Sequence, residues 1–189
     1  DGSSVARSSG YWAPIDAPPM YFPPQPPKER VRVWVAASPR GISDCFVVED
    51  GAPLRQPDYL AECIDARLEP FIKQHYSSKR LAQKYVYWPA VCNLSYSARV
   101  RKSLESKSIR FVERDENPRN ARGLRTFSEF WKTLKERVFR GFWRAKNVDQ
   151  LARRIRQCIA EMNQDQACLR ELFGAKIHET LDKTSREGC

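Results

Sequence analysis

Six acidic side chains are the residues of this sequence best suited to metal chemistry: Asp44, Glu49, Asp50, Glu113, Asp115 and Glu129. Hard divalent cations such as Mg²⁺ need oxygen ligands, and two such ions can activate the attacking oxygen and stabilise the leaving oxygen in phosphodiester cleavage. Asp115 lies in a predicted loop, where a solvated charge is the ordinary role. For Glu129 we favour a helix cap, because Thr126-Phe127-Ser128-Glu129 has the spacing of a capping box with Thr126 as N-cap.

The cysteines and histidines do not have the spacing of a zinc site. The six cysteines, at positions 45, 63, 92, 158, 168 and 189, form no C-x-x-C pair, and His75 and His178 are distant from them in sequence. Cys63, Cys158 and Cys168 fall within helical patterns, which predicts buried free thiols and a reducing, intracellular compartment. With only eight glycines and no glycine-rich loop, a nucleotide cradle is not expected either. We therefore predict no metal and no cofactor.

Positive charge is concentrated in one quarter of the chain. Of a net charge of +10, residues 99–146 contribute +9, with fifteen Lys or Arg and six Asp or Glu. A basic block of this kind indicates a polyanionic partner, most often nucleic acid. The alternative, which charge alone leaves open, is a solvated helical face.

The first thirty residues read as an extended arm that precedes the folded domain of residues 31–189. Seven of the thirteen prolines lie there, and proline fixes φ and removes a hydrogen-bond donor, so the arm is not part of a sheet interior. Its aromatic residues, which we expect to fasten the arm onto the domain or a partner, are Tyr11, Trp12, Tyr21 and Phe22.

The domain is predicted to be α/β, with a mixed sheet flanked by helices and with helices at the C-terminus. β-Branched runs and turn residues predict a hairpin of residues 31–37 and 45–49, and further strands at 85–88 and 109–112. Apolar residues at three- and four-residue intervals predict helices at 57–76, 95–107, 126–142, 148–162 and 169–181. Asn147 and Gln150 are predicted to cap the helix at 148, and the helix at 126 is predicted to carry Phe142 on its buried face. Five further aromatic residues are expected in the core: Trp34, Trp88, Phe111, Phe130 and Trp131. No apolar run is long enough to cross a bilayer, which predicts no membrane partner.

Three segments in this order resemble the catalytic core of mariner-type transposases. Val31-Arg32-Val33-Trp34-Val35 with Ser38-Pro39-Arg40-Gly41 resembles its V-M-V-W…S-x-x-G segment, and Tyr87-Trp88-Pro89-Ala90 through Tyr96 resembles its second catalytic block. Asn117-Pro118-Arg119-Asn120 through Trp131 resembles its third block, and Asp149-Gln150-Leu151 matches the downstream helices. The resemblance runs from about Tyr11 to Arg156. The resemblance implies a ribonuclease-H-like fold and a nuclear protein that binds DNA. It also implies three acidic residues that hold two metal ions.

The sequence departs from that family at the acidic positions. Ala90 stands where the second acid is expected, Ser128 stands at the third, and Ser95 replaces a nearby histidine. The first acid belongs on a strand before the arm. Because a methyl group cannot bind a metal and a serine is a poor ligand, we predict that the chain is not an enzyme. Ala90 and Ser128 would be vestigial positions of a degenerate, domesticated transposase.

Three functions remain open from the sequence. The first is DNA binding through basic residues that flank the vestigial site: Arg99, Arg101, Lys102, Arg119, Arg122 and Arg125. The second is a scaffold in a chromatin or genome-defence complex, with a protein partner or a second copy of the chain bound through the arm or the helices. The third is a residual metal-dependent DNA endonuclease or transposase that uses the six acids named above.

Overall fold

The structure, a computed structural model, describes residues 31–49, 51–117 and 127–175. Its strands are β1 (Val31–Trp34), β2 (Ala37–Ser38), β3 (Gly41–Ile42) and β4 (Phe46–Glu49). Its helices are α1 (Gln56–Asp58), η1 (Tyr59–Leu68), α2 (Glu69–Tyr76), α3 (Lys79–Ala82), α4 (Ala98–Ser106), α5 (Phe127–Val138), η3 (Arg140–Phe142), α6 (Val148–Gln164), α7 (Gln166–Arg170) and η4 (Glu171–Ala175). The arm of residues 1–30 and its four aromatic residues lie outside the described residues.

A single hairpin contains all four strands, as the sequence predicts. β1 pairs antiparallel with β4 from Val31↔Glu49 to Trp34↔Phe46, and β2 pairs with β3 around the turn at Pro39-Arg40. Two residues, 35 and 36, separate the two ladders on the first strand, whereas three, 43–45, separate them on the second. The extra residue makes a β-bulge, which interrupts the ladder and increases the local twist.

The hairpin is apolar on both of its faces. One face carries Val33, Val35 and Val47, which belong to one core cluster, and the other carries Trp34 and Phe46, which belong to a second. Because successive residues of a strand point to opposite sides, the near-continuous apolar run at 31–37 supplies both faces at once. The hairpin is therefore the middle of three layers.

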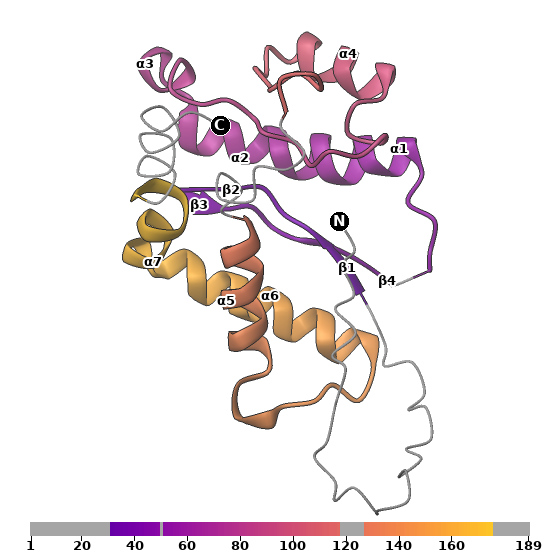
Figure 1. The fold of residues 1–189 in the computed structure, drawn as a ribbon, viewed down its shortest axis with the longest axis vertical. Helices are drawn as coiled ribbons and strands as arrows, with labels where there is room; N and C mark the ends of the chain where they lie inside the picture. The colour runs from indigo at the N-terminus through magenta and orange to yellow at the C-terminus, as the bar shows by residue number, and fades with distance from the viewer. Residues whose placement is uncertain (1–30, 50, 118–126, 176–189) are drawn as a thin grey trace, which may run out of the picture.

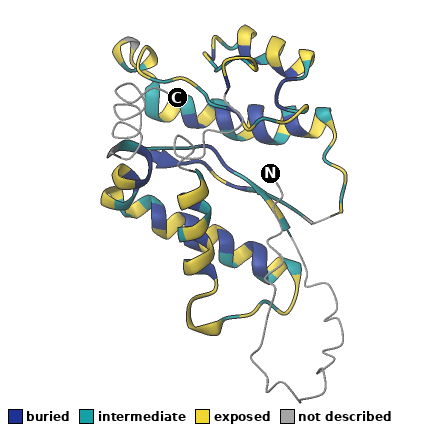
Figure 2. Ribbon diagram, viewed as in Figure 1, coloured by how far each residue is buried: buried dark blue, intermediate teal, exposed yellow. Residues whose placement is uncertain are grey.

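The first outer layer, here called the α6 layer, consists of α5, α6 and α7. Their apolar stripes, which include Phe130, Leu134, Ile155 and Ile159, face the hairpin, and their exposed residues face outward (Figures 1 and 2). α6 is capped as predicted: the Asn147 side chain accepts a hydrogen bond from the Gln150 N–H at 2.9 Å.

The second outer layer, the α2 layer, consists of α1, η1, α2 and α4, on the other side of the hairpin (Figure 1). The predicted helix at 57–76 is present as the continuous run α1–η1–α2, which changes to wider π-type hydrogen bonding at Tyr59–Leu68. Pro70 contributes to the irregularity, since it offers no N–H to the preceding turn. Buried Val100 and Leu104 hold α4 onto this layer.

The mixed sheet is not formed as predicted within the described residues. The segments at 85–88 and 109–112 are not strands but meet in one parallel bridge, Tyr87↔Phe111, which carries two backbone hydrogen bonds of 2.8 and 2.9 Å. Pro89 has no N–H to extend this pairing, and the backbone after it turns into a loop. The described fold thus combines helices with small antiparallel sheets.

Some predictions of burial are wrong. Phe142 is 99% exposed, because α5 ends at Val138 and the chain leaves the helical face before it reaches residue 142. Phe130 is fully buried as predicted, but the other four aromatic residues, Trp34, Trp88, Phe111 and Trp131, are only partly buried. Cys63 and Cys158 are buried as predicted, whereas Cys168 is partly exposed. The last predicted helix corresponds to α7 and η4, and the part beyond Ala175 lies outside the described residues.

Across the described ranges, no helix combines the length and the apolar character needed to span a bilayer.

Because both helical layers pack on one hairpin, we expect them to unfold together. Leu104→Ala in the α2 layer and Leu134→Ala in the α6 layer should each lower the free energy of unfolding by about 2–5 kcal/mol, the usual loss for a buried leucine. Urea denaturation followed by circular dichroism should give one cooperative transition for both variants. Two separate transitions, each moved by only one variant, would contradict a shared core.

Candidate nucleic-acid interface

The segment that carries Ala90 is held in place by Asn117. The Trp88 indole N–H donates to Asn117 Oδ1 at 2.8 Å, and Asn117 Nδ2 donates to the Pro89 carbonyl at 2.9 Å and to the Tyr96 hydroxyl at 2.6 Å. Asn117 is 2% exposed; its bonds to Pro89 and Tyr96 are buried, and the bond from Trp88 is partly buried. The second and third segments of the transposase resemblance are therefore joined by one buried side chain. We call Trp88, Pro89, Tyr96 and Asn117 the Asn117 frame.

A second polar network links Tyr59, Tyr87, Cys92 and Ser95. The Tyr59 hydroxyl is 3.2 Å from Ser95 Oγ and 3.4 Å from the Tyr87 hydroxyl, and Ser95 Oγ is 3.0 Å from Cys92 Sγ. Burial raises the pKa of both tyrosines, most strongly for Tyr87, so the hydroxyls stay protonated. Ser95, which stands where the resemblance expects a histidine, is buried and acts in packing.

The two positions that the resemblance predicts to be vestigial lie on different layers. Ala90 is exposed at the end of a segment that packs with the α2 layer through Tyr85, Tyr87 and Leu94. Ser128 is exposed in the first turn of α5, within the α6 layer. Of the described residues, neither core cluster contains members of both segments.

The α4 helix presents the basic residues predicted to bind DNA. Arg99, Arg101 and Lys102 are all exposed, opposite the buried Val100 and Leu104. Arg101 is engaged by Glu113 at 3.4 Å. Arg99 and Lys102 are one helical turn apart and make no ion pair with any described residue. Arg119, Arg122 and Arg125 lie outside the described residues, so the predicted six-residue face is seen only in its α4 part.

Lys107 anchors the C-terminal end of α4 to the α2 layer. Its ammonium group contacts Glu69 and lies 3.2 Å from the Asp65 carboxylate. The hydrogen bond from Lys107, together with one from Lys73, lowers the pKa of Glu69. These contacts orient the helix so that Arg99 and Lys102 point outward.

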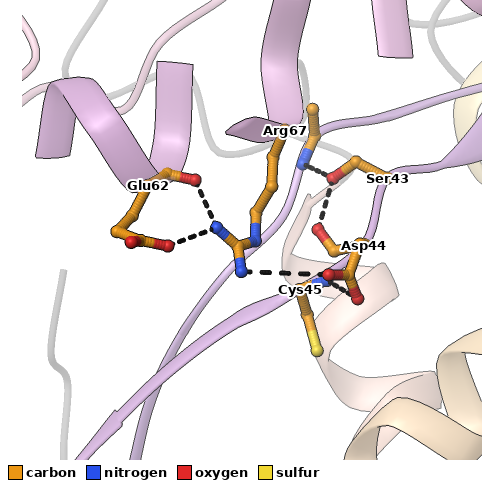
Figure 3. Close-up of polar contacts among 6 residues, drawn as sticks. Ser43, Asp44, Cys45, Glu62 and Arg67 are labelled. Atoms are coloured by element: carbon orange, nitrogen blue, oxygen red, sulfur yellow. Dashed lines mark hydrogen bonds and ion pairs between the residues drawn. The ribbon is translucent and has the colours of Figure 1, made fainter. Parts of the chain in front are cut away.

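Figure 3 shows a further charge cluster, which surrounds Arg67 of η1. The guanidinium donates to Glu62 Oε2 at 2.8 Å, lies 3.8 Å from Asp44 Oδ2 and covers the Phe46 ring. The Arg67 side chain is 14% exposed, and its Nε has no hydrogen-bond partner in the described part of the chain. Arg67 therefore fastens η1 to the β-bulge.

Two polar side chains complete the bulge. The Ser43 hydroxyl accepts a hydrogen bond from the Ala36 N–H at 2.9 Å, and Asp44 Oδ1 accepts one from the Cys45 N–H at 2.9 Å (Figure 3). Both N–H groups would otherwise lose their ladder partners at the bulge. The role of this cluster is structural.

Those of the six candidate acids whose side chains the structure describes are not gathered into a metal site. Asp44 pairs with Arg67, Glu113 pairs with Arg101, and Asp115 is exposed in a turn. Glu129 is exposed on α5 in the other layer, Asp50 lies outside the described residues, and so does the side chain of Glu49. Thr126 is not described either, so the proposed capping box stays a prediction. Within 31–49, 51–117 and 127–175, no three His, Cys, Asp or Glu side chains are grouped so that they could hold a metal ion.

The sequence patterns did not identify Arg67, Asn163 or the role of Asn117. Asn163 of α6 accepts from the Ile42 N–H at 2.6 Å and donates to the Ile42 carbonyl at 2.8 Å, so its amide substitutes for a strand partner. Arg67 and Asn163 are polar residues within helical patterns, where the sequence predicts exposure to solvent. Their contacts depend on how the helices pack against the hairpin. Of these three residues, only Asn117 could have been found from the sequence, because it begins the third segment of the transposase resemblance.

No protein-family model matches this sequence, and no curated protein is significantly similar to it.

Removing the Asn117 side chain should destabilise the fold. Asn117→Ala leaves the Trp88 indole N–H and the Pro89 carbonyl without their partner. Each group left unpaired should lower the free energy of unfolding by about 1–3 kcal/mol. Asn93→Ala is the matched control, because Asn93 is exposed and its side chain bonds the exposed Arg114, and it should cost less than about 0.5 kcal/mol. Equal losses for both variants in urea denaturation would contradict the frame.

Thiol reactivity should distinguish the cysteines. Cys92 is exposed, whereas burial raises the pKa of Cys63 to about 12 and leaves it a protonated, inaccessible thiol. In the native protein we expect Ellman's reagent to label Cys92 rapidly and Cys63 and Cys158 only on unfolding. Mass spectrometry assigns the labelled positions, and Cys92→Ser should remove the corresponding fast phase. Rapid labelling of Cys63 would contradict the packing of η1.

Proposed function

We propose that this chain is a catalytically inactive, transposase-derived nuclear protein that binds DNA and serves as a scaffold in a chromatin or genome-defence complex. The observation that carries the proposal is Ala90 beside the Asn117 frame. A methyl group occupies the position where the resemblance expects a metal ligand, while the side chains around it keep their hydrogen bonds. This combination favours an architecture kept for binding, within a ribonuclease-H-like fold.

The α4 face supports DNA as the ligand. Arg99 and Lys102 project from a helix that is fixed by buried leucine and valine on one side and by Lys107 at its end. Flexible cations on a rigid helix can neutralise phosphates without reading base sequence. We expect Arg119, Arg122 and Arg125 to extend this face.

A scaffold role is compatible with DNA binding. By resemblance, the arm with Tyr11, Trp12, Tyr21 and Phe22, or the helices, would bind a protein partner or a second copy of the chain. Affinity purification from nuclei with and without nuclease treatment separates the two roles. Partners released by nuclease treatment were bridged by DNA, and partners retained were bound by the protein.

The alternative, a residual metal-dependent endonuclease, has less support from the geometry. Asp44 and Glu113 form ion pairs with arginine side chains, and Glu129 lies in the α6 layer, away from them. A Mg²⁺- or Mn²⁺-dependent nick in plasmid DNA, abolished by Asp44→Asn or Glu113→Gln, would establish this alternative and refute inactivity.

The proposed DNA contact predicts a specific salt dependence. For a duplex of random sequence, measured by fluorescence anisotropy, the affinity of the full chain should fall steeply as salt rises. The double variant Arg99→Gln, Lys102→Gln should reduce the slope of log affinity against log salt by about 2, one for each phosphate that is no longer neutralised.

The matched control removes the same charge elsewhere. Arg156 and Arg170 are exposed on α6 and α7, and the double variant Arg156→Gln, Arg170→Gln should change the slope much less. An affinity that does not depend on salt, or equal effects of the two double variants, would refute binding through α4.

A further inference from the structure

The connection between α5 and α6 contains two adjacent aromatic residues with opposite surroundings. Trp143 is partly buried against the α6-layer core, and the Arg154 guanidinium lies 5.9 Å from its ring centre. Phe142 is 99% exposed, and Phe139, one turn earlier, is 51% exposed. Trp143 anchors the turn and Phe142 is presented to solvent.

The backbone holds Phe142 in an unfavourable conformation. Gly141 and Phe142 have φ values of 69° and 60°, both in the left-handed region. Glycine adopts this region without strain, whereas a bulky side chain rarely does, and such outliers cluster at functional sites. Neither burial nor local geometry favours Phe at position 142, so its contribution to folding does not account for the ring.

The turn around Phe142 is strongly basic. Arg140, Arg144 and Lys146 are exposed, and no acidic residue occurs between Glu136 and Asp149. Exposed aromatic rings among Arg and Lys are the means by which proteins hold unpaired nucleic-acid strands, since bases stack on the rings and phosphates contact the cations. A duplex keeps its bases stacked inside and offers no free base face to Phe142.

We propose that residues 139–146 form a binding site for single-stranded nucleic acid, with a base stacked on Phe142 and phosphates held by Arg140, Arg144 and Lys146. The site lies at the far end of the α6 layer, whereas α4 lies on the other side of the hairpin (Figure 1). The inference rests on the proposed function for its ligand class, but it uses different residues and a different form of nucleic acid.

The test measures binding of the full chain to a fluorescein-labelled oligo-dT strand of about 15 nucleotides, a length within the range of known single-strand sites. Phe142→Gly should weaken this binding between about fivefold and a hundredfold, because removing the ring under one stacked base has an effect of that size. Phe142→Trp keeps an aromatic surface and should bind at least as tightly as the unchanged chain.

Two controls make the result decisive. Glycine suits a left-handed position, so Phe142→Gly should fold with an undiminished Tm, and weaker binding then reports the ring alone. Duplex affinity should stay within about twofold for Phe142→Gly and should fall instead for the Arg99, Lys102 double variant. Duplex binding therefore tests the α4 proposal, and oligo-dT binding tests this inference, so either one can fail without the other.

Two outcomes would overturn the inference. Equal oligo-dT affinity of the Phe142→Gly variant and the unchanged chain would show that the ring does not bind the strand. Phe142-dependent binding to vesicles of phosphatidylserine and phosphatidylcholine, without binding to oligo-dT, would assign the turn to an anionic membrane surface.

Discussion

The structure depends on one hairpin that is apolar on both faces. Val33, Val35 and Val47 belong to the α6 layer, and Trp34 and Phe46 belong to the α2 layer, so a short piece of sheet supplies the contact surface for both sets of helices. Polar ties fix the helices to the same hairpin: Arg67 reaches the bulge from η1, and the Asn163 amide bonds the backbone of Ile42 from α6. These contacts hold the two helical layers, and with them the candidate binding residues that the structure describes, on opposite faces of the hairpin.

The two basic regions differ in how they are built. α4 carries Arg99 and Lys102 on a regular helix whose inner side is fully buried, which suits contact with evenly spaced phosphates. The α5–α6 turn instead displays a single ring from a strained backbone, with cations around it. The chain therefore presents a charged helical face on α4 and an exposed aromatic ring at Phe142, in two layers that the hairpin separates.

Sequence periodicity predicted the hairpin and the helices, because they are determined by local alternation and by apolar repeats. α6, with its Asn147 cap, is the clearest case. Periodicity failed where long-range contacts decide the outcome. The segments at 85–88 and 109–112 have strand-like composition, yet Pro89 and the side-chain bonds of Asn117 turn the chain away after a single bridge. Phe142 continued the apolar repeat of α5, but the helix ends four residues before it. Of the predicted binding residues, only those of α4 lie in the described part of the chain.

The β-bulge also determines how the hairpin is tied to the α2 layer. Deleting one residue from 43–45 would leave two residues between the ladders on both strands, so Trp34 would still lie opposite Phe46 and each face would keep its side chains. The bulge itself would be lost, together with the Ser43 and Asp44 oxygens that accept its backbone N–H groups and the Asp44 carboxylate that meets Arg67. An insertion in the connection between β4 and α1 would leave all of these contacts unchanged. The length of the hairpin at the bulge is therefore constrained by the contact with η1, whereas the facing of its strands is not at stake.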